Sequence, residues 1–121
     1  MNEKITVDYD DENDNLFVFL QNEDYDYSEI ITKNVFIDFN KDEKPVGFEI
    51  DNASKLFKTN KSNLKNIIGG NVKIVIDEKD INLNVNLYVE IQKQSVYLNP
   101  INIIENNNFN IPSIETTHVL T

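Results

Sequence analysis

The stretch Ile81-Asn82-Leu83-Asn84-Val85-Asn86-Leu87-Tyr88-Val89-Glu90-Ile91 decides the fold class of this chain. Every second residue in it is apolar, which is the period-2 pattern of a β-strand with one buried face. The other face is rich in Asn, so it is either solvated or paired through side-chain amides. The apolar run 72–76 precedes this stretch across a polar turn at 78–80. The two segments therefore predict an antiparallel hairpin.

The first part of the chain shows the same alternation. Ile5, Val7 and Tyr9 alternate with polar residues, and a polar turn leads into the apolar and aromatic run 16–20. These features predict a first hairpin. A second hairpin is predicted where Val35, Ile37 and Phe39 alternate, followed by Val46, Phe48 and Ile50. Its register is well specified, because a slip of one residue would bury Glu49 and Asp51.

Residues 53–68 change from period 2 to a helical period. Their apolar residues fall on one side of a helical wheel, and Lys58, Lys61 and Lys65 fall beside them. Gly69-Gly70 is a strong stop signal for such a helix. We therefore expect one amphipathic helix near the middle of the chain, at about 53–68.

These elements predict an α+β, mainly β fold of about seven to nine antiparallel strands in hairpins or a meander. We expect one domain over 1–121, because this length suits a single core. Its parts are an acidic double hairpin (1–51), the helix with its Gly-Gly stop (52–70), further strands (71–105) and an uncertain tail (106–121). Alternating strands need a second layer, which a second sheet, the helix or a homodimer would supply. A faint likeness between 4–20 and 73–87 fits either a duplicated hairpin or chance.

The composition limits the classes of function. The chain of 121 residues has 21 acidic residues, 11 Lys and no Arg, and its formal net charge is −10. This charge repels nucleic acid, and Arg is the usual bidentate reader of phosphate and guanine, so we expect no specific DNA binding. The chain has no Cys and no apolar run approaching the roughly 18 residues that span a bilayer. We therefore expect a cytoplasmic protein with no membrane partner.

The acidic stretch Asp8, Asp10, Glu12 and Asp14 suggests a calcium loop, because calcium prefers several oxygen ligands from a short segment. The spacing does not fit an EF-hand, since the position of its bidentate Glu falls on Phe19 or Gln21. Charged residues in a hairpin turn need no ligand to explain them. Weak divalent-cation binding by the Asp8–Asp14 turn is therefore kept as the alternative function.

No residue pattern marks a catalytic centre. The chain has one His, His118, near its C-terminal end, where no pattern of nucleophile, base and orienting acid is recognisable, and it has no Gly-rich loop suited to phosphate. Carboxylates are abundant, but a pair becomes an active site only when a cleft shifts its pKa values. We expect no enzyme activity and no cofactor.

The row Lys58, Lys61 and Lys65 is the one concentrated positive segment, because residues 52–71 carry four Lys and no acid. It offers a contact for an acidic protein, RNA or the acidic hairpins of a second copy. The simpler interpretation is a solvated side of the predicted helix.

Two segments resemble a known family. Tyr9-Asp10-Asp11-Glu12-Asn13-Asp14-Asn15-Leu16-Phe17-Val18 resembles the opening motif of the prokaryotic domain-of-unknown-function family twenty-two eighty-three (DUF2283). Val35–Phe39 and Val46–Ser54 resemble its second motif, in which two strands lead into a short helix. The resemblance covers residues 4–57, and Pro45 replaces the more usual Gly-containing turn.

The resemblance implies a small β-meander without an established activity, and an antitoxin-like binding role. The physical interpretation agrees with it, because an acidic surface suits a basic partner. We therefore predict a non-catalytic protein-interaction module that binds an unidentified protein or associates with itself.

Overall fold

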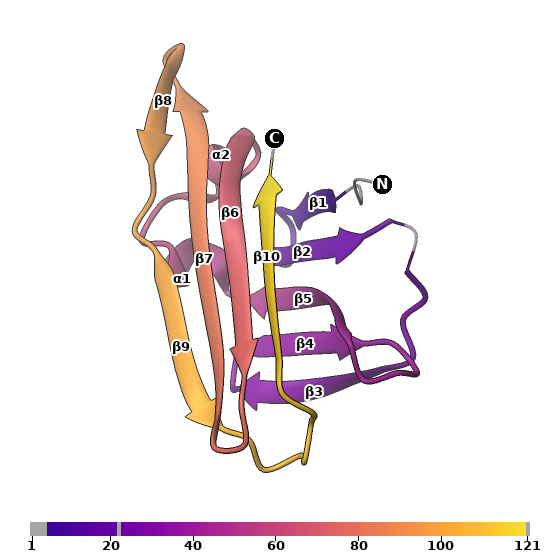
Figure 1. Cartoon of the computed structure of the whole chain (residues 1–121). Coiled ribbons are helices and arrows are strands. Elements are labelled where there is room, and N and C mark those ends of the chain that lie inside the picture. Colours follow the sequence, from indigo (N-terminus) through magenta and orange to yellow (C-terminus); the bar gives the residue numbers. More distant parts are fainter. Residues whose placement is uncertain (1–4, 22, 121) are drawn as a thin grey trace. The chain divides into compact units, whose positions relative to one another are not determined.

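The alternating segments form strands in the computed structural model, which describes residues 5–21 and 23–120 (Figure 1). The described chain is mainly β, with two antiparallel sheets and two helices of four residues each. It forms two compact units, Met1–Asn52 and Ala53–Thr121. The single-domain organisation of residues 1–121 stays a prediction.

The first unit is a five-stranded sheet in the order β1-β2-β5-β4-β3. Its strands are β1 (Ile5–Asp10), β2 (Asn15–Leu20), β3 (Tyr27–Thr32), β4 (Val35–Phe39) and β5 (Pro45–Asp51). Both predicted hairpins are confirmed, and β5 lies between β4 and β2. One face is buried and consists of Leu16, Val18, Leu20, Val35, Ile37, Phe39, Val46, Phe48 and Ile50.

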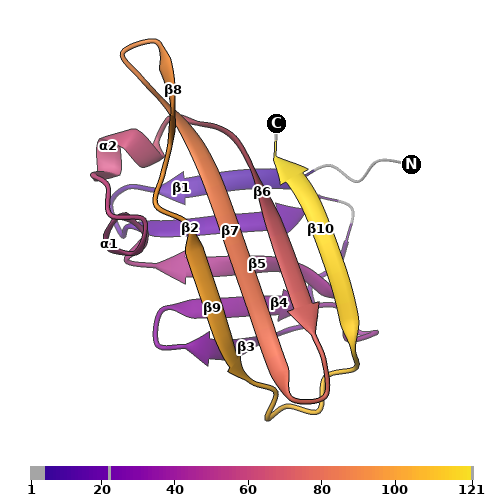
Figure 2. The same ribbon diagram turned by 60° about the vertical axis from the view of Figure 1, so that its left-hand side comes forward.

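The second unit contains the long alternating stretch 81–91. Its strands are β6 (Ile67–Ile76), β7 (Asp80–Ile91), β8 (Gln94–Tyr97), β9 (Ile101–Asn106) and β10 (Ile114–Leu120). The sheet order is β10-β6-β7-β8, and β9 also pairs with β7. Figure 2 shows β8 and β9 along one edge of β7, where they pair with opposite ends of that strand. The alternate residues Ile81, Leu83, Val85, Leu87 and Val89 are fully buried, as the pattern predicts.

The Asn-rich face of β7 is paired through side-chain amides. The Asn86 amide Nδ2 donates to Asn71 Oδ1 at 2.8 Å and to Asn84 Oδ1 at 2.7 Å. The Tyr97 hydroxyl group donates to Asn86 Oδ1 at 2.5 Å, and its ring lies 5.1 Å from that of Tyr88. This network gives hydrogen-bond partners to both the amide nitrogen and the oxygen of the Asn86 side chain.

The prediction of one helix over 53–68 is wrong. The structure has α1 (Ala53–Leu56) and α2 (Lys61–Leu64), each one turn long. The amide of Lys58 donates to Lys55 O and the amide of Thr59 donates to Ser54 O, which is the Schellman pattern that ends a helix. Lys58 has the left-handed φ of 54° that this motif requires. Asn60 then caps α2, because its side chain accepts from the Asn63 amide.

The prediction that Gly69-Gly70 ends the helix is also wrong, because both residues lie within β6. The pairing of β6 with β7 shifts register between Ile67 and Gly69. Gly70 has a φ of 148°, and a Cβ atom there would lie 2.0 Å from the Asn86 carbonyl oxygen. Glycine is therefore needed for the close approach of β6 to β7.

The described residues contain ten strands, more than the seven to nine predicted. The difference lies in the last part of the chain, where residues 96–103 contribute to two strands and β10 forms within the predicted uncertain tail. β10 pairs with β6 from Ile114 to Leu120. Neither described helix is long enough to cross a membrane.

Candidate functional site

The face of the first sheet opposite its buried side chains combines aromatic and acidic residues. We call it the outer face and define it by Asp8, Phe17, Phe19, Phe36, Asp38, Gly47 and Glu49, which alternate with the other strand residues. The register places Phe17 opposite both Asp8 and Glu49, and Glu49 opposite Phe36. Residues directly opposite in antiparallel strands share a face. The pairing of these strands therefore brings the side chains into adjacent rows.

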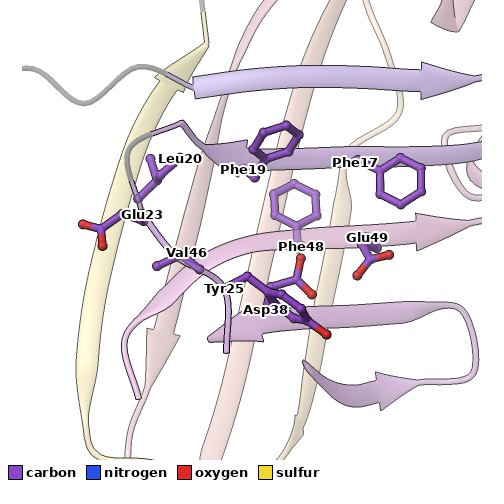
Figure 3. A pocket seen from close by; sticks show the side chains of 9 residues that line it. All are labelled: Phe17, Phe19, Leu20, Glu23, Tyr25, Asp38, Val46, Phe48 and Glu49. Atoms are coloured by element: carbon purple, nitrogen blue, oxygen red, sulfur yellow. The ribbon is translucent and has the colours of Figure 1, made fainter. Parts of the chain in front are cut away.

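An open pocket of about 390 Å³ lies on the first unit. Its lining residues are Phe17, Phe19, Leu20, Glu23, Tyr25, Asp38, Val46, Phe48 and Glu49. Figure 3 shows the Phe17 and Phe19 rings on β2, the carboxyl groups of Asp38 and Glu49 on β4 and β5, and Tyr25 from the loop before β3. Among the described residues that line it, three are acidic and none is Lys. The pocket thus combines aromatic side chains with negative charge.

Asp38 and Glu49 form a hydrogen-bonded carboxyl pair in this pocket. Burial, the hydrogen bond to Asp38 and the negative charge of Asp38 together raise the pKa of Glu49 from 4.5 to about 7. The Ser28 hydroxyl group donates to Asp38 Oδ1 at 2.5 Å from the neighbouring strand β3. Glu49 is therefore about half protonated near pH 7 and loses its proton above that range.

Gly47 lies between Phe19 and Asp38 in the register of the three strands. A Cβ atom at this position would lie 2.7 Å from the Val18 carbonyl oxygen and 3.0 Å from Phe19 Cβ. Real Cβ atoms do not approach backbone oxygen so closely. Glycine therefore allows β5 and β2 to pair closely beside the pocket.

The predicted cation-binding residues hold the first turn together by internal hydrogen bonds. Asp10 Oδ1 accepts from the Glu12 amide at 3.1 Å, and Asp10 Oδ2 accepts from Asn13 Nδ2 at 2.8 Å. Asp14 is buried, and its Oδ1 accepts from the Tyr9 hydroxyl group at 2.6 Å. Burial and this hydrogen bond raise the pKa of Tyr9 well above its ordinary range. Asp8 lies on the outer face, opposite Phe17.

No group of three or more His, Asp or Glu within residues 5–21 and 23–120 is arranged to hold a metal ion. The acidic stretch that suggested a calcium loop is therefore divided between strand β1 and a turn whose side chains form hydrogen bonds within the turn itself.

The three lysines singled out in the sequence do not form one helical row. Lys58 lies in the turn after α1, Lys61 begins α2, and Lys65 is the C-terminal cap of α2. Lys58 and Lys55 line an open hollow of about 620 Å³ with Ser54, Thr59, Asn60 and Asn63. These lysines do lie close together in the sequence, but they belong to two separate one-turn helices and the turn between them.

The Asp38–Glu49 pair was not identified from the sequence. Alternation alone indicates that Glu49 lies opposite the buried face, but it does not show which acid of another strand is its neighbour. The sequence of β2 could have indicated the pocket, because Phe17 and Phe19 alternate with Leu16, Val18 and Leu20. A strand that is apolar on both faces indicates that its second face is also covered or used.

The fold and the site define a small acidic antiparallel β protein with an open pocket of carboxyl and aromatic side chains. Residues 6–54 match the family described as protein of unknown function (DUF2283). The chain belongs to this family through that segment, which confirms the resemblance of its first part. A comparison with solved structures found no match.

Two curated proteins are similar over a longer span. An uncharacterised protein of Methanocaldococcus jannaschii is 39% identical over 99 residues, which cover 77% of this chain and 84% of the relative. A protein of Methanosarcina mazei named putative hypoxanthine phosphoribosyltransferase is 33% identical over 82 residues. That match covers 68% of this chain and 66% of the relative. The similarity to both relatives therefore extends beyond residues 6–54, which the family model matches.

Proposed function

We propose that this protein is a non-catalytic protein-interaction module that binds its partner through the outer face of the first sheet. The observation that carries the proposal is the exposure of large apolar and aromatic side chains on this unit. Phe19 is 41% exposed, Tyr25 63% and Ile30 61%. Ile30 lies opposite Phe36, so it continues the row that contains Phe17 and Glu49. Exposed apolar side chains beside polar ones are typical of protein interfaces.

The charge of the first unit supports a basic partner. Residues 1–51 contain 15 acidic residues and four Lys, which gives a net charge of −11. Such a field accelerates encounter with a positive surface and repels a second copy of this chain. The negative charge favours an antitoxin-like role, in which the module binds and neutralises a basic protein. We place that encounter in the cytoplasm, since a cysteine-free chain suits a reducing compartment.

The name of the Methanosarcina relative suggests transfer of a phosphoribosyl group for that protein. Glu23 is ion-paired with Lys44 at 3.6 Å, but the negative charge of Asp38 and of ionised Glu49 would repel the phosphate groups of such a substrate from this pocket. Glu49, with its pKa near 7, also has the acidity of a general acid or base. The exposed Phe19 and Tyr25 leave the pocket accessible to water, however, which weakens the electrostatic stabilisation that catalysis requires. Binding is therefore favoured over catalysis.

Site-specific photo-cross-linking in living cells tests the proposal. A photoreactive phenylalanine analogue replaces Phe19 in one variant and Tyr97 of the second unit in a matched control, since both residues are exposed aromatics. We expect a discrete cross-link to another protein from position 19 and none from position 97. Equal cross-linking from both positions would remove the outer face as the interface.

An assay for hypoxanthine phosphoribosylation by the purified chain tests the catalytic alternative. We expect no turnover above the uncatalysed rate. Turnover that is lost in a Glu49→Gln variant would replace the binding proposal with an enzyme.

A further inference from the structure

Resting on the proposed function, we propose that the pocket receives the side chain of one Lys or Arg from a basic segment of the partner. The inference concerns the chemistry of the occupant, whereas the proposed function concerns only the use of the outer face. It is carried by the combination of a cavity, aromatic side chains on two sides and a pair of carboxyl groups.

The aromatic side chains suit a cation. Phe17 and Phe19 are two residues apart on β2, so both rings lie on the outer face, and Tyr25 approaches from the loop before β3 (Figure 3). The faces of aromatic rings carry partial negative charge and attract an ammonium or guanidinium group. Their apolar surface also covers the methylene stem of a Lys or Arg side chain. A carboxylate or phosphate occupant would gain neither interaction.

The carboxyl pair supplies the charge complement. Ser28 on β3 holds Asp38 on β4, and Asp38 is hydrogen-bonded to Glu49 on β5. A planar guanidinium group can bond two carboxylate oxygens at once, and an ammonium group has three donors. The volume of about 390 Å³ falls within the range of about 300–1,000 Å³ for ligand sites, so a long side chain fits.

Binding of a cation also displaces the proton of Glu49. The groups that raise the pKa of Glu49 are its burial, Asp38 on β4 and Asp51 on its own strand. On the remaining strands of the outer face, Asp8 lies on β1, Phe17 on β2 and Ser28 on β3, and none of these three side chains carries a positive charge. An incoming Lys or Arg therefore favours the ionised form of Glu49 and releases a proton. Affinity consequently increases as the pH rises through about 7.

The test uses amide NMR spectra of the full chain titrated with the blocked pentapeptide acetyl-Gly-Gly-Arg-Gly-Gly-amide. A peptide with citrulline in place of arginine is the control, because citrulline has nearly the same shape without the charge. We expect saturable shifts for the arginine peptide at residues 17–19, 38 and 47–49. We expect the citrulline peptide to bind about tenfold more weakly or not at all, as loss of a charged hydrogen bond predicts. The affinity for the arginine peptide should increase about fivefold from pH 6 to pH 8.

The double variant Asp38→Asn with Glu49→Gln should abolish these shifts. The matched control, Glu78→Gln with Glu105→Gln, removes two negative charges from the second unit and should bind as the wild type does. Retained binding in the first variant would overturn the inference. So would linear shifts spread over all acidic loops, which would mean charge screening only.

The two proposals fail in different ways. A cross-link from position 19 without arginine-peptide binding would refute the basic occupant and leave the interface intact. Self-association, measured as concentration-dependent sedimentation and abolished by Phe19→Lys, would identify a second copy of this chain as the occupant. That result would also refute the basic occupant.

Discussion

The carboxyl group of Glu49 on β5 is hydrogen-bonded to that of Asp38 on β4. Burial and the neighbouring carboxyl group of Asp38 disfavour ionisation of Glu49, so the folded protein binds a proton that the unfolded chain releases at lower pH. This relationship connects the stability of the first sheet with the state of its pocket.

The first prediction concerns the pH dependence of stability. The pKa of Glu49 is raised from 4.5 to about 7 by burial and by Asp38, so its contribution to stability is complete below about pH 4.5. That contribution is lost as the pH rises to about 7, because the folded state binds more protons than the unfolded state throughout this window. Glu49→Gln imitates the protonated form. We expect it to raise the free energy of unfolding at pH 8 by about 1 kcal/mol, a value reduced for solvent screening, and to change it little at pH 5.

Urea denaturation of both proteins at pH 5 and pH 8 measures this difference. Glu105→Gln is the control, since Glu105 is exposed on β9 in the other unit. An equal effect of Glu49→Gln at both pH values would contradict the raised pKa of Glu49.

A second prediction concerns Gly47. A methyl group at this position would meet the Val18 carbonyl oxygen at 2.7 Å and Phe19 Cβ at 3.0 Å. Neither atom can move without disturbing the pairing of β2 with β5. We expect Gly47→Ala to lower the free energy of unfolding by about 1–3 kcal/mol, the usual range for overpacking.

Gly69→Ala is the matched comparison, because its new Cβ would meet only the Leu120 carbonyl oxygen, at 3.1 Å. Thermal denaturation should show a smaller loss for Gly69→Ala. The reverse order would contradict the tight contact at Gly47.

A third prediction distinguishes two short helices from one continuous helix. Lys58 adopts the left-handed conformation with φ of 54°, at the position of the Schellman motif where glycine is most common. Lys58→Gly should therefore raise the free energy of unfolding by about 0.5–1 kcal/mol. Lys55→Gly, within α1, should lower it by a similar amount. In a continuous helix both substitutions would be destabilising, and chemical denaturation of the two variants decides between the structures.

The strands were predictable because alternation is a local property. In β7, for example, apolar residues recur at every second position. This pattern can be recognised from residues close in the sequence, and it indicates both the strand and its buried side. The interruption of the predicted helix and the start of β6 were harder to predict. Asn60 is an ordinary polar residue in a helical wheel, but a side chain that bonds the Asn63 amide starts a new helix there. Gly70 fits equally well a helix stop or a point where two strands approach closely.

The site was less predictable because it depends on register. Glu49 and Asp38 are eleven positions apart, and only the pairing of β4 with β5 makes them neighbours. β10 was missed for a related reason. Its positions include Thr116 and His118 where an alternating strand would carry apolar residues, so the pattern is weak and the strand is stabilised by its pairing with β6.

The last prediction concerns calcium and the first turn. Asp10 accepts hydrogen bonds from Glu12 and Asn13, and Asp14 accepts one from Tyr9, so a cation would have to displace bonds that close the hairpin. We therefore expect amide NMR titration with calcium to give small, linear shifts over all acidic loops at physiological ionic strength, because screening acts on every exposed charge. Asp10→Asn should leave these shifts unchanged. Saturable shifts confined to residues 8–16, with a dissociation constant below about 1 mM and lost in Asp10→Asn, would instead establish a cation site in this turn.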